Sequence, residues 1–378
     1  MRFLFLNQYG PPDRAPTAQL LGEVADGLRA HGHIVDFVSD AADYLASQGA
    51  GRRLVREFIA LLRLAWKGLR RERPAVVLSG SSPPCLAVVA GVIAWWHGAR
   101  SVHWAMDLYP ELAVALGEFR EGWLSRVLGE FQRAAYRGCE RVVVLDEDMA
   151  ATLRGYGVES EIVQPWVLEG RSIPSVQSSP RTLHAGLPWR WIYSGNLGRA
   201  HEWRTLLEAQ AILERRGIEA ELVFQGGGGS WGAAREHAAA LGLKGCRFRP
   251  YVPERELVAT LLESDCLVAS QVASARGLLW PSKLALLLAM PRPMLWVGAR
   301  NGACWRLVEG KDRSACFEPG DAEALAEWIC GRVSSGYALD VVTEFGGGDG
   351  DGLARLVSLL TGEGVGAEFH GGASACCS

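Results

Sequence analysis

The sequence predicts an α/β fold made of two doubly wound, Rossmann-like domains that face each other across a cleft. Short apolar runs alternate with amphipathic runs from the first residues onward, which is typical of parallel strands joined by helices. A polar stretch rich in Ser and Pro, at 169–188, interrupts this alternation, and the alternation then starts again. A length of 378 residues is sufficient for two such cores.

The first half of the chain predicts strands, amphipathic helices and one uncharged helix. The expected strands are Phe3–Leu6, Ile34–Val38, Val76–Leu78, Val102–Trp104 and Val142–Leu145, and the expected amphipathic helices are Thr17–Arg29, Arg52–Arg71 and Trp123–Arg137. The uncharged run Cys85–Trp96 is too short to cross a bilayer, so we expect it to form a helix buried in the domain.

The second half predicts a further sheet, and its last part departs from the pattern. Apolar runs favour strands at Trp191–Tyr193, Glu221–Phe224, Arg247–Phe248, Cys266–Ala269, Met294–Val297 and Ala315–Phe317. Leu353–Leu360 predicts one more helix, and the composition of Gly362–Ser378 is typical of a disordered tail. We therefore expect a first domain at 1–168, a linker at 169–188, a second domain at 189–330, and a C-terminal helix with a tail at 331–378.

The composition argues against several classes of protein. A formal net charge of −3 argues against nucleic acid as a partner, because nucleic-acid-binding surfaces are basic. The 9 cysteines form no C-x-x-C and have no histidine at ligand spacing, so we expect reduced thiols and no metal site. The opening Met1–Leu6 is too short for the apolar core of a signal peptide, which favours a cytoplasmic location.

The most informative stretch is Trp191–Trp203, in which an apolar run ends in S-G-N-L-G-R and an amphipathic run follows. This order predicts a strand, a glycine-rich turn and a helix, with Arg199 where the turn meets the helix. Gly195 and Gly198 let the backbone approach a ligand, helix N-terminal N–H groups favour anions, and an arginine fork suits a phosphate. The turn, which includes Asn196, therefore predicts a site for a phosphorylated ligand. The alternative is an ordinary tight turn.

The motif W-P-S-K, before the helical run Leu284–Met290, predicts a second ligand loop. Pro281 and Ser282 are good residues for opening a helix, so the backbone N–H groups of this turn would be free for an anion. Lys283 and Arg199 would then hold a diphosphate between two helix N-termini. The alternative is a plain helix cap with a solvated lysine.

Gly226–Gly232 contains a formal G-x-G-x-x-G motif after an expected strand. A dinucleotide site would also place an acid at the end of the next strand. Glu254 and Glu256 have suitable spacing but follow Pro250 and Pro253, outside any expected strand. We therefore interpret this segment as a flexible connection between a strand and a helix.

Three loops of the first domain are expected to face the same cleft. N-Q-Y-G-P-P, with Gln8 and Tyr9, closes the first strand, and S-S-P-P at 81–84 closes the third. The strongest candidate is H-W-A-M-D-L-Y-P-E, which places Asp107 and Glu111 just past a buried strand. Acids in a cleft can bind sugar hydroxyls or take a proton. The alternative is that they only cap the next helix.

The segment 52–73 predicts a basic amphipathic helix. Its basic residues share one face of a helical wheel, and its apolar residues, including Phe58 and Trp66, cover the other. Such a helix can lie on an anionic membrane surface. The alternative is a helix that packs its apolar face on the sheet and leaves its basic face in solvent.

With these loops placed, the sequence resembles the bacterial GT-B-fold glycosyltransferases of the family-4 type, and among them those that build surface polysaccharides on lipid carriers. The resemblance runs from Met1 to about Ile329. It rests on L-N-Q-Y-G-P-P, Gly32-His33, S-S-P-P, D-L-Y-P-E and Y-S-G-N-L-G-R-A-H, and P-S-K-L and E-P-G-D continue it. The order of these motifs along one chain carries the resemblance more than any single motif does.

The resemblance implies a retaining transfer of a hexose or N-acetylhexosamine from a nucleoside diphosphate sugar, a UDP-sugar above all, to a lipid-linked or saccharide acceptor. It implies no metal and no cofactor, a donor bound mainly by the second domain, and an acceptor that enters from the first. The residues that it marks are, for catalysis, Asp107, Arg199 and Lys283; for the donor, Gly195, Asn196, Gly198, Tyr251, Val252 and Ser282; and for the acceptor side, Gln8, Tyr9 and Glu111. It also implies a cytoplasmic enzyme that can lie peripherally on the inner face of the cell membrane.

The chain departs from the family pattern where many relatives carry two glutamates eight residues apart. The matching positions here are Leu278 and Leu286, and Pro291-Arg292-Pro293 replaces the usual Gly-x-Pro. The two leucines leave open a nucleotide- or sugar-binding relative without turnover. A nucleotide-sugar epimerase would need more acids and bases in the cleft, and a nicotinamide oxidoreductase has only the glycine motif in its favour.

Overall fold

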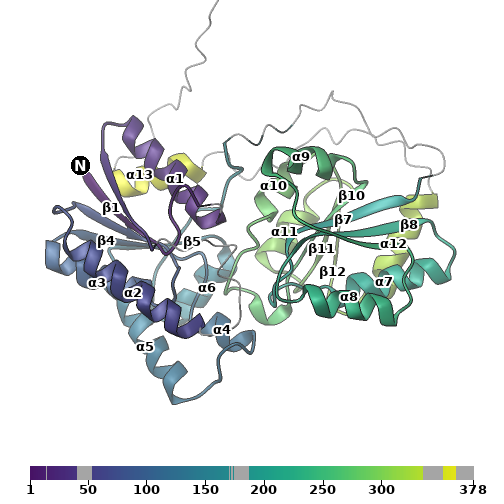
Figure 1. The fold of residues 1–378 in the computed structure, drawn as a ribbon, viewed down its shortest axis with the longest axis horizontal. Coiled ribbons are helices and arrows are strands. Elements are labelled where there is room, and N and C mark those ends of the chain that lie inside the picture. Colours follow the sequence, from purple (N-terminus) through teal and green to yellow (C-terminus); the bar gives the residue numbers. More distant parts are fainter. Residues whose placement is uncertain are drawn as a thin grey trace, which may run out of the picture.

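The computed structural model describes residues 1–13, 15–40, 53–169, 171, 173, 187–334 and 352–362 of the chain. Two sheets of six parallel strands each dominate this part, and helices cover both faces of each sheet (Figure 1). The predicted α/β class with two doubly wound units is confirmed.

The first sheet has the strand order β2-β1-β3-β4-β5-β6, and every neighbouring pair is parallel. Its strands are β1 (Arg2–Leu6), β2 (Ile34–Val38), β3 (Val76–Ser79), β4 (Arg100–Trp104), β5 (Arg141–Val144) and β6 (Glu161–Ile162). The helices between them are α1 (Pro16–Ala30), α2 (Arg53–Leu69), α3 (Leu86–His97), α4 (Glu111–Ala115), α5 (Trp123–Gly138) and α6 (Glu147–Gly155).

The second sheet has the order β12-β11-β10-β7-β8-β9, again with parallel pairs throughout. Its strands are β7 (Trp189–Asn196), β8 (Ala220–Gly227), β9 (Cys246–Arg249), β10 (Cys266–Ser270), β11 (Met294–Val297) and β12 (Ala315–Phe317). The helices are α7 (Arg204–Arg215), α8 (Trp231–Ala240), α9 (Glu254–Leu262), α10 (Leu284–Ala289), α11 (Ala303–Glu309) and α12 (Ala322–Ser334), with a short 3-10 turn, η2 (Ala273–Ala275), after β10.

Side chains of β1 show how the first core is divided between the two faces of its sheet. Successive strand residues point to opposite faces. Leu4 and Leu6 pack in one apolar cluster with side chains of α2 and α3, whereas Phe3 and Phe5 belong to the cluster that includes α1. In Figure 1, α2, α3 and α5 accordingly lie on one side of this sheet and α1 on the other.

A last helix, α13 (Gly352–Thr361), follows the second domain in sequence but packs on the first, against α1. Leu356, Val357 and Leu360 are buried in the first core. The predicted helix is present, and its position on the first domain is a feature that the sequence analysis did not predict. Most of the predicted linker lies outside the described residues, and so does the predicted tail beyond 362. The helix α12 continues to Ser334, past the expected end of the second domain at 330.

The expectation that the uncharged run Cys85–Trp96 forms a buried helix is wrong, and α2 buries less apolar surface than a helix packed by its whole apolar face would. The uncharged run expected to be buried forms α3, but Trp95 and Trp96 are 80% and 65% exposed. On α2, the buried side chains are Ala60 and Leu64, while Phe58 and other large apolar residues face outward. A helix that lies on a sheet buries only one stripe of its surface, so an apolar run with no polar side leaves part of itself exposed. Among the described helices, none is both long and apolar enough to span a membrane.

Candidate active site

The topology marks one crevice in each sheet. In the second sheet, β7 and β10 are neighbours, and the strands that follow them lie on opposite sides of this pair. Ligands of doubly wound sheets bind beyond the carboxyl ends of the strands at such a switch point. Here β7 ends at Gly195–Asn196, and the chain beyond β10 leads through η2 to Lys283. The sequence-predicted loops therefore meet where the topology expects a ligand.

Lys283 lies in this crevice with its ammonium group buried. A Cβ built on Gly195 would lie 3.4 Å from both Cε and Nζ of Lys283, and the Nζ lies 3.4 Å from the centroid of the Tyr193 ring. Gly195 has a φ of 130°, a conformation that favours glycine. Within the described part of the chain, the Nζ has no hydrogen-bond partner. Burial lowers the pKa of Lys283 well below its ordinary value, because the charged form loses its hydration.

Other polar atoms on the same elements are buried without a partner among the described residues. They are Oδ1 of Asn196, Oγ of Ser270 and Nε1 of Trp280. Native proteins pair nearly all buried polar groups. Such atoms also occur elsewhere in the described residues, at His103 and Trp296 for example, so it is the position of these atoms at the switch point that favours a polar ligand. Sequence reasoning found Asn196 through its turn, but Ser270 and Trp280 carry no motif that could have singled them out.

His201 provides a fixed neutral group beside this cluster. Its Nδ1 donates to the carbonyl oxygen of Ser270 over 2.9 Å, so Nδ1 carries the proton. Burial, and to a smaller extent the nearby Lys283, lowers the pKa of His201 to about 3. The imidazole is therefore neutral at physiological pH, with its Nε2 as an acceptor.

The glycine-rich segment after β8 packs closely against the first ligand loop. Gly195 pairs with Gly226 in the parallel register, and a Cβ built on Gly226 would lie 2.2 Å from the carbonyl oxygen of Gly195. A Cβ on Gly228 would lie 2.2 Å from Oδ1 of Asn196, and φ is 137° at Gly226 and 127° at Gly228. The interpretation of this segment as a flexible connection is therefore wrong, because its glycines allow two backbones to pack in contact.

Tyr251 covers the edge of this packed backbone. A Cβ on Gly227 would lie 3.1 Å from Cε2 of Tyr251, whose side chain is 49% exposed. Val252 beside it is half-buried. An aromatic ring half-open to solvent beside the ligand loops is suitable for stacking on a base.

The predicted helix N-termini need correction. The helix α7 begins at Arg204, and Oε1 of Glu202 accepts a hydrogen bond from the backbone N–H of Thr205 over 3.0 Å. A carboxylate therefore already caps this helix, and Arg199 lies five positions before its start, in an exposed turn that also contains Gly198. The Arg199 side chain makes no hydrogen bond or ion pair with a described residue.

The second expected helix start also differs. Lys283, rather than Ser282, occupies the N-cap position of the short helix α10, and Ser282 is exposed. Lys283 therefore does stand at a helix N-terminus, whereas Arg199 does not, and a diphosphate held by the two side chains stays a prediction. The structure presents a buried lysine against a glycine, with Arg199 free to approach from the surface.

In the first sheet, the switch point between β1 and β3 is filled by side chains that bind one another. The backbone N–H of Gln8 donates to the carbonyl oxygen of Ser82 over 2.6 Å, and its Oε1 accepts from the Ser82 hydroxyl over 2.9 Å. Asn7 donates through Nδ2 to the carbonyl oxygen of Tyr9 over 2.7 Å. Gln8 is buried and Tyr9 half-buried, so both lie at the predicted position as parts of an ordered loop.

The two acids of the loop after β4, Asp107 and Glu111, lie in different surroundings. Oγ of Ser81 accepts hydrogen bonds from the backbone N–H groups of Met106 and Asp107, over 2.7 and 3.2 Å, which fixes the backbone that carries the Asp107 carboxylate. Glu111 begins α4, and its carboxylate pairs with Nη2 of Arg133 on α5 over 3.1 Å. Asp107 thus remains a candidate for chemistry, whereas Glu111 holds α4 to α5.

The two domains meet at Asp107. This residue forms an isolated antiparallel bridge with Leu279, and the backbone N–H of Leu108 donates to the carbonyl oxygen of Leu278 over 2.7 Å. Asp107 therefore lies beside the loop that leads to Lys283.

The same loop is tied to the turn that carries Arg199. Nε2 of Gln271 donates to the carbonyl oxygen of Leu279 over 2.9 Å. The backbone N–H of Val272 donates to the carbonyl oxygen of Ala200, also over 2.9 Å. Backbone contacts therefore link Asp107, the Lys283 loop and the Arg199 turn into one connected structure.

The two leucines at the family's glutamate positions face apolar surroundings. Leu278 packs with the cluster around Leu112 and Ala275, and Leu286 is 4% exposed in the main core. Neither side chain can accept a hydrogen bond from a ribose or sugar hydroxyl. Any such contact has to come from the other polar groups of the crevice.

Comparison with known proteins shows which family the first part of the chain is similar to. Residues 17–167 match the family described as Glycosyltransferase Family 4. The fold is GT-B, and residues 17–167 are similar to Glycosyltransferase Family 4. The predicted resemblance to family-4-type GT-B glycosyltransferases of polysaccharide biosynthesis is confirmed by this match together with the relatives below.

A candidate colanic acid biosynthesis glycosyl transferase, WcaI of Escherichia coli K12, is 25% identical over 250 residues, which are 63% of this chain and 61% of WcaI. The chain thus spans less than two thirds of the length of that relative. Among solved structures, the lipopolysaccharide outer core galactosyltransferase WaaB has a TM-score of 0.65 at 12% identity, covering 96% of this chain and 100% of WaaB. Anabaena HepE, solved with UDP-glucose, has a TM-score of 0.64 at 13% identity, with 95% of each chain covered. These structural likenesses show the GT-B fold.

Proposed function

We propose that the chain transfers a sugar from a nucleoside diphosphate sugar, a UDP-sugar above all, to a lipid-linked or saccharide acceptor in cell-surface polysaccharide biosynthesis. The observation that carries the proposal is the buried Nζ of Lys283 beside Gly195, at the switch point of the second sheet, which has no hydrogen-bond partner among the residues that the structure describes. A buried ammonium group gains most from a multiply charged anion, and a diphosphate also gains negative charge as it leaves the sugar. HepE, which shares the fold, was solved with UDP-glucose and with UDP.

The roles of the other site residues follow from their positions. Arg199 would close on the diphosphate from the surface, while the half-exposed ring of Tyr251, with Val252, would hold the base. Asp107 would bind a hydroxyl of the donor sugar or of the acceptor, which enters past Gln8 and Tyr9. The transfer is proposed to retain the configuration of the sugar and to require neither metal nor cofactor, with a hexose or N-acetylhexosamine as the sugar.

The proposal includes a cytoplasmic location, with peripheral contact to the inner face of the membrane through 52–73. In this segment the side chains are described from Val55 onward, and Arg56, Arg63 and Lys67 are exposed. The outward apolar residues of α2 favour the membrane interpretation over a helix that packs its apolar face on the sheet.

A thermal-shift series with UDP, GDP, ADP, CMP and NAD tests the donor site. A ligand that binds only the native state raises the melting temperature. We expect UDP to give the largest shift, and the shift to shrink in Arg199→Ala and in Lys283→Met but not in Arg235→Ala, a matched surface change on α8. A shift with NAD alone would instead indicate an oxidoreductase, and no shift with any ligand would contradict the proposal.

A second candidate function is a nucleotide- or sugar-binding protein without turnover, which the buried, apolar environment of Leu286 favours. Hydrolysis of a UDP-sugar in the absence of acceptor separates the two. The transferase predicts measurable UDP release that falls in Asp107→Asn while the UDP-induced thermal shift is unchanged. Binding without release in the wild type would support the non-catalytic protein, and release unchanged in Asp107→Asn would remove Asp107 from the mechanism.

A further inference from the structure

Exposed large apolar side chains are concentrated on one part of the first domain. Of the 17 that the described residues expose, 12 stand on α2, α3 and α5. Soluble proteins rarely gather such residues in one contiguous region unless the region meets a partner. No residue of the crevice described above is among these 12.

The three helices are neighbours on the same face of the first sheet. α2 contacts α3, and α3 contacts α5. Figure 1 shows them side by side below the strands, on the side opposite α1 and α13. Their outward surfaces therefore form one continuous face, which we name the three-helix face.

α3 forms the apolar centre of this face. It buries Ala90 and Ile93 toward the sheet, while Val92, Trp95 and Trp96 are 53%, 80% and 65% exposed. No residue from Leu86 to Trp96 is charged. The helix thus presents apolar side chains to both the sheet and the solvent.

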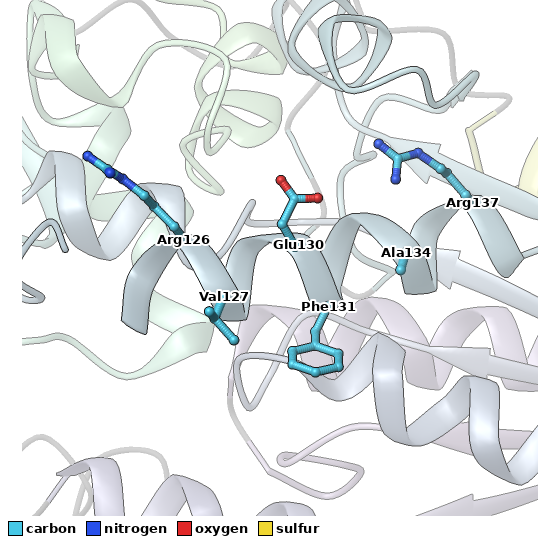
Figure 2. A pocket seen from close by; sticks show the side chains of 6 residues that line it. All are labelled: Arg126, Val127, Glu130, Phe131, Ala134 and Arg137. Carbon is cyan, nitrogen blue, oxygen red and sulfur yellow. The ribbon is translucent and has the colours of Figure 1, made fainter. Parts of the chain in front are cut away.

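α5 continues the face on one side. Trp123, Val127 and Phe131 follow each other at four-residue spacing, which places them on one stripe of the helix, and all three are exposed. Figure 2 shows Val127 and Phe131 projecting from one side of α5, while Arg126, Glu130 and Arg137 project from the other. These residues, with Ala134, line a shallow hollow of about 460 Å³.

α2 continues the face on the other side and adds positive charge. Phe58, Leu62 and Trp66 are exposed, and the guanidinium of Arg70 lies 3.4 Å from the centroid of the Trp66 ring. Between residues 55 and 73 the chain has six basic residues and two acidic ones. Basic residues therefore border the apolar centre.

We propose that the three-helix face docks on an anionic lipid bilayer, with the side chains of α3 and α5 entering the interfacial region and α2 binding the headgroups. Four of its exposed residues are tryptophans, Trp66, Trp95, Trp96 and Trp123, and tryptophan is the side chain that favours the boundary between water and hydrocarbon. Apolar insertion and attraction of basic residues to anionic lipid act together in interfacial helices. This goes beyond a contact through 52–73, because it assigns the inserting part to α3 and α5.

The position of the face fits a transferase that works on a membrane-held acceptor, a consequence that rests on the proposed function. Helices that follow parallel strands begin at the carboxyl edge of the sheet, where the crevice lies. The exposed Val55 and Phe58 near the start of α2, and Trp123 at the start of α5, are therefore on the crevice side. Trp95 and Trp96, at the end of α3, lie toward the opposite edge, so the face runs along the helices from one edge of the sheet to the other. Docking through this face holds the crevice edge beside the bilayer at one end of the contact.

The test is flotation of the full chain with vesicles of phosphatidylcholine alone and of phosphatidylcholine with phosphatidylglycerol, without nucleotide. We expect binding to the anionic vesicles that weakens about tenfold or more in Arg63→Glu with Lys67→Glu, because each basic residue near the surface contributes about 1 kcal/mol. Trp95→Ser with Trp96→Ser should weaken it about tenfold by removing two inserting rings. All four positions are exposed, but Arg63 pairs with Asp40 and Lys67 donates to the carbonyl oxygen of Ser39. Thermal unfolding therefore checks that each variant keeps its fold before flotation is compared.

Matched controls lie outside the first domain. Arg215→Glu with Arg235→Glu makes the same change of charge, and Leu187→Ser with Leu241→Ser removes exposed apolar side chains elsewhere. Both pairs should float like the wild type. Equal flotation with neutral vesicles, or equal loss in the control pairs, would overturn the proposal. A dimer in lipid-free sedimentation that Trp95→Ser with Trp96→Ser disrupts would also overturn it and assign the face to a second copy. Because flotation needs no nucleotide, these outcomes do not depend on the transfer activity.

Discussion

The crevice loops of the two domains differ in how their polar groups are paired. In the first domain, Gln8 binds Ser82, Ser81 binds the backbone before Asp107, and Glu111 binds Arg133. In the second domain, the polar atoms of Lys283, Asn196 and Ser270 are buried without partners among the described residues. Paired groups form a rigid surface, whereas unpaired buried groups lower stability until a ligand binds them. The comparison suggests that the first domain positions an acceptor and that the second gains its binding energy from the donor.

The largest expected effect comes from comparing two buried lysines of the second domain. Lys311 donates to the carbonyl oxygens of Leu287, Leu288 and Met290 over 3.2, 2.6 and 2.7 Å, whereas Lys283 has no such acceptor in the part of the chain that the structure describes. We expect Lys283→Met to weaken UDP binding by about a hundredfold or more while the melting temperature stays the same or rises.

Lys311→Met is the matched control for that change. It leaves three carbonyl groups at the end of α10 unpaired, so it should lower the free energy of unfolding by about 3 kcal/mol. Calorimetric titration and chemical unfolding of both variants measure the two quantities. A strong loss of stability in Lys283→Met would mean that this lysine has a structural partner and is not waiting for a ligand.

Two glycines of one loop provide the next comparison. Gly226→Ala would place a Cβ 2.2 Å from the carbonyl oxygen of Gly195 at a φ of 137°, whereas nothing lies within 4 Å of a Cβ on Gly229. We expect Gly226→Ala to cost about 2 kcal/mol or more in unfolding free energy and to weaken UDP binding, because the backbone of the donor loop must shift. Gly229→Ala should leave both unchanged. Equal tolerance of the two changes would restore the interpretation of this loop as a flexible connection.

The strands, the helices and the loops at the strand ends were predicted from the spacing of apolar residues along the chain. The apolar runs that became β1 and β7 alternate with amphipathic helices, and the carboxyl ends of those strands carry the predicted loops. Local pattern fixes where a strand ends, so Gln8, Gly195 and Asn196 were found at the crevice.

The features that the sequence did not predict arise from contacts between segments that are distant along the chain. No pattern around Lys283 reveals that its ammonium group is buried beside Gly195, and no pattern in α13 reveals that it packs on α1. The start of α7 was placed too early because Glu202 caps the helix from a position that propensity alone does not favour. The uncharged sequence of α3 was interpreted as buried because composition reports hydrophobicity and not which side of a helix has a neighbour.

A smaller effect should follow from Ser81, which positions Asp107. Ser81→Ala removes the acceptor of two backbone N–H groups, so we expect the free energy of unfolding to fall by about 2 kcal/mol. Because the Asp107 backbone would loosen, turnover should fall while UDP binding is retained. Ser82→Ala, which removes only the bond to Gln8, should leave turnover closer to the wild type. If Ser81→Ala lowers stability but leaves turnover unchanged, Ser81 serves the fold alone.

The smallest effect is an uptake of less than one proton per bound UDP, and it separates the roles of Lys283 and Arg199 in the proposed donor site. Burial lowers the pKa of Lys283 in the free protein, and a bound diphosphate would raise it again by supplying negative charge. Between these two pKa values the free lysine has partly lost its proton and the bound lysine has regained it. UDP binding should therefore take up protons, and its affinity should fall as the pH rises through this window. Titration calorimetry in buffers with different ionisation enthalpies measures the uptake. Arg199→Ala should weaken binding yet keep the uptake, because an arginine does not titrate in this range. Uptake absent in the wild type, or lost with Arg199, would mean that Lys283 is already charged in the free protein and that the crevice is less isolated from water than its geometry indicates.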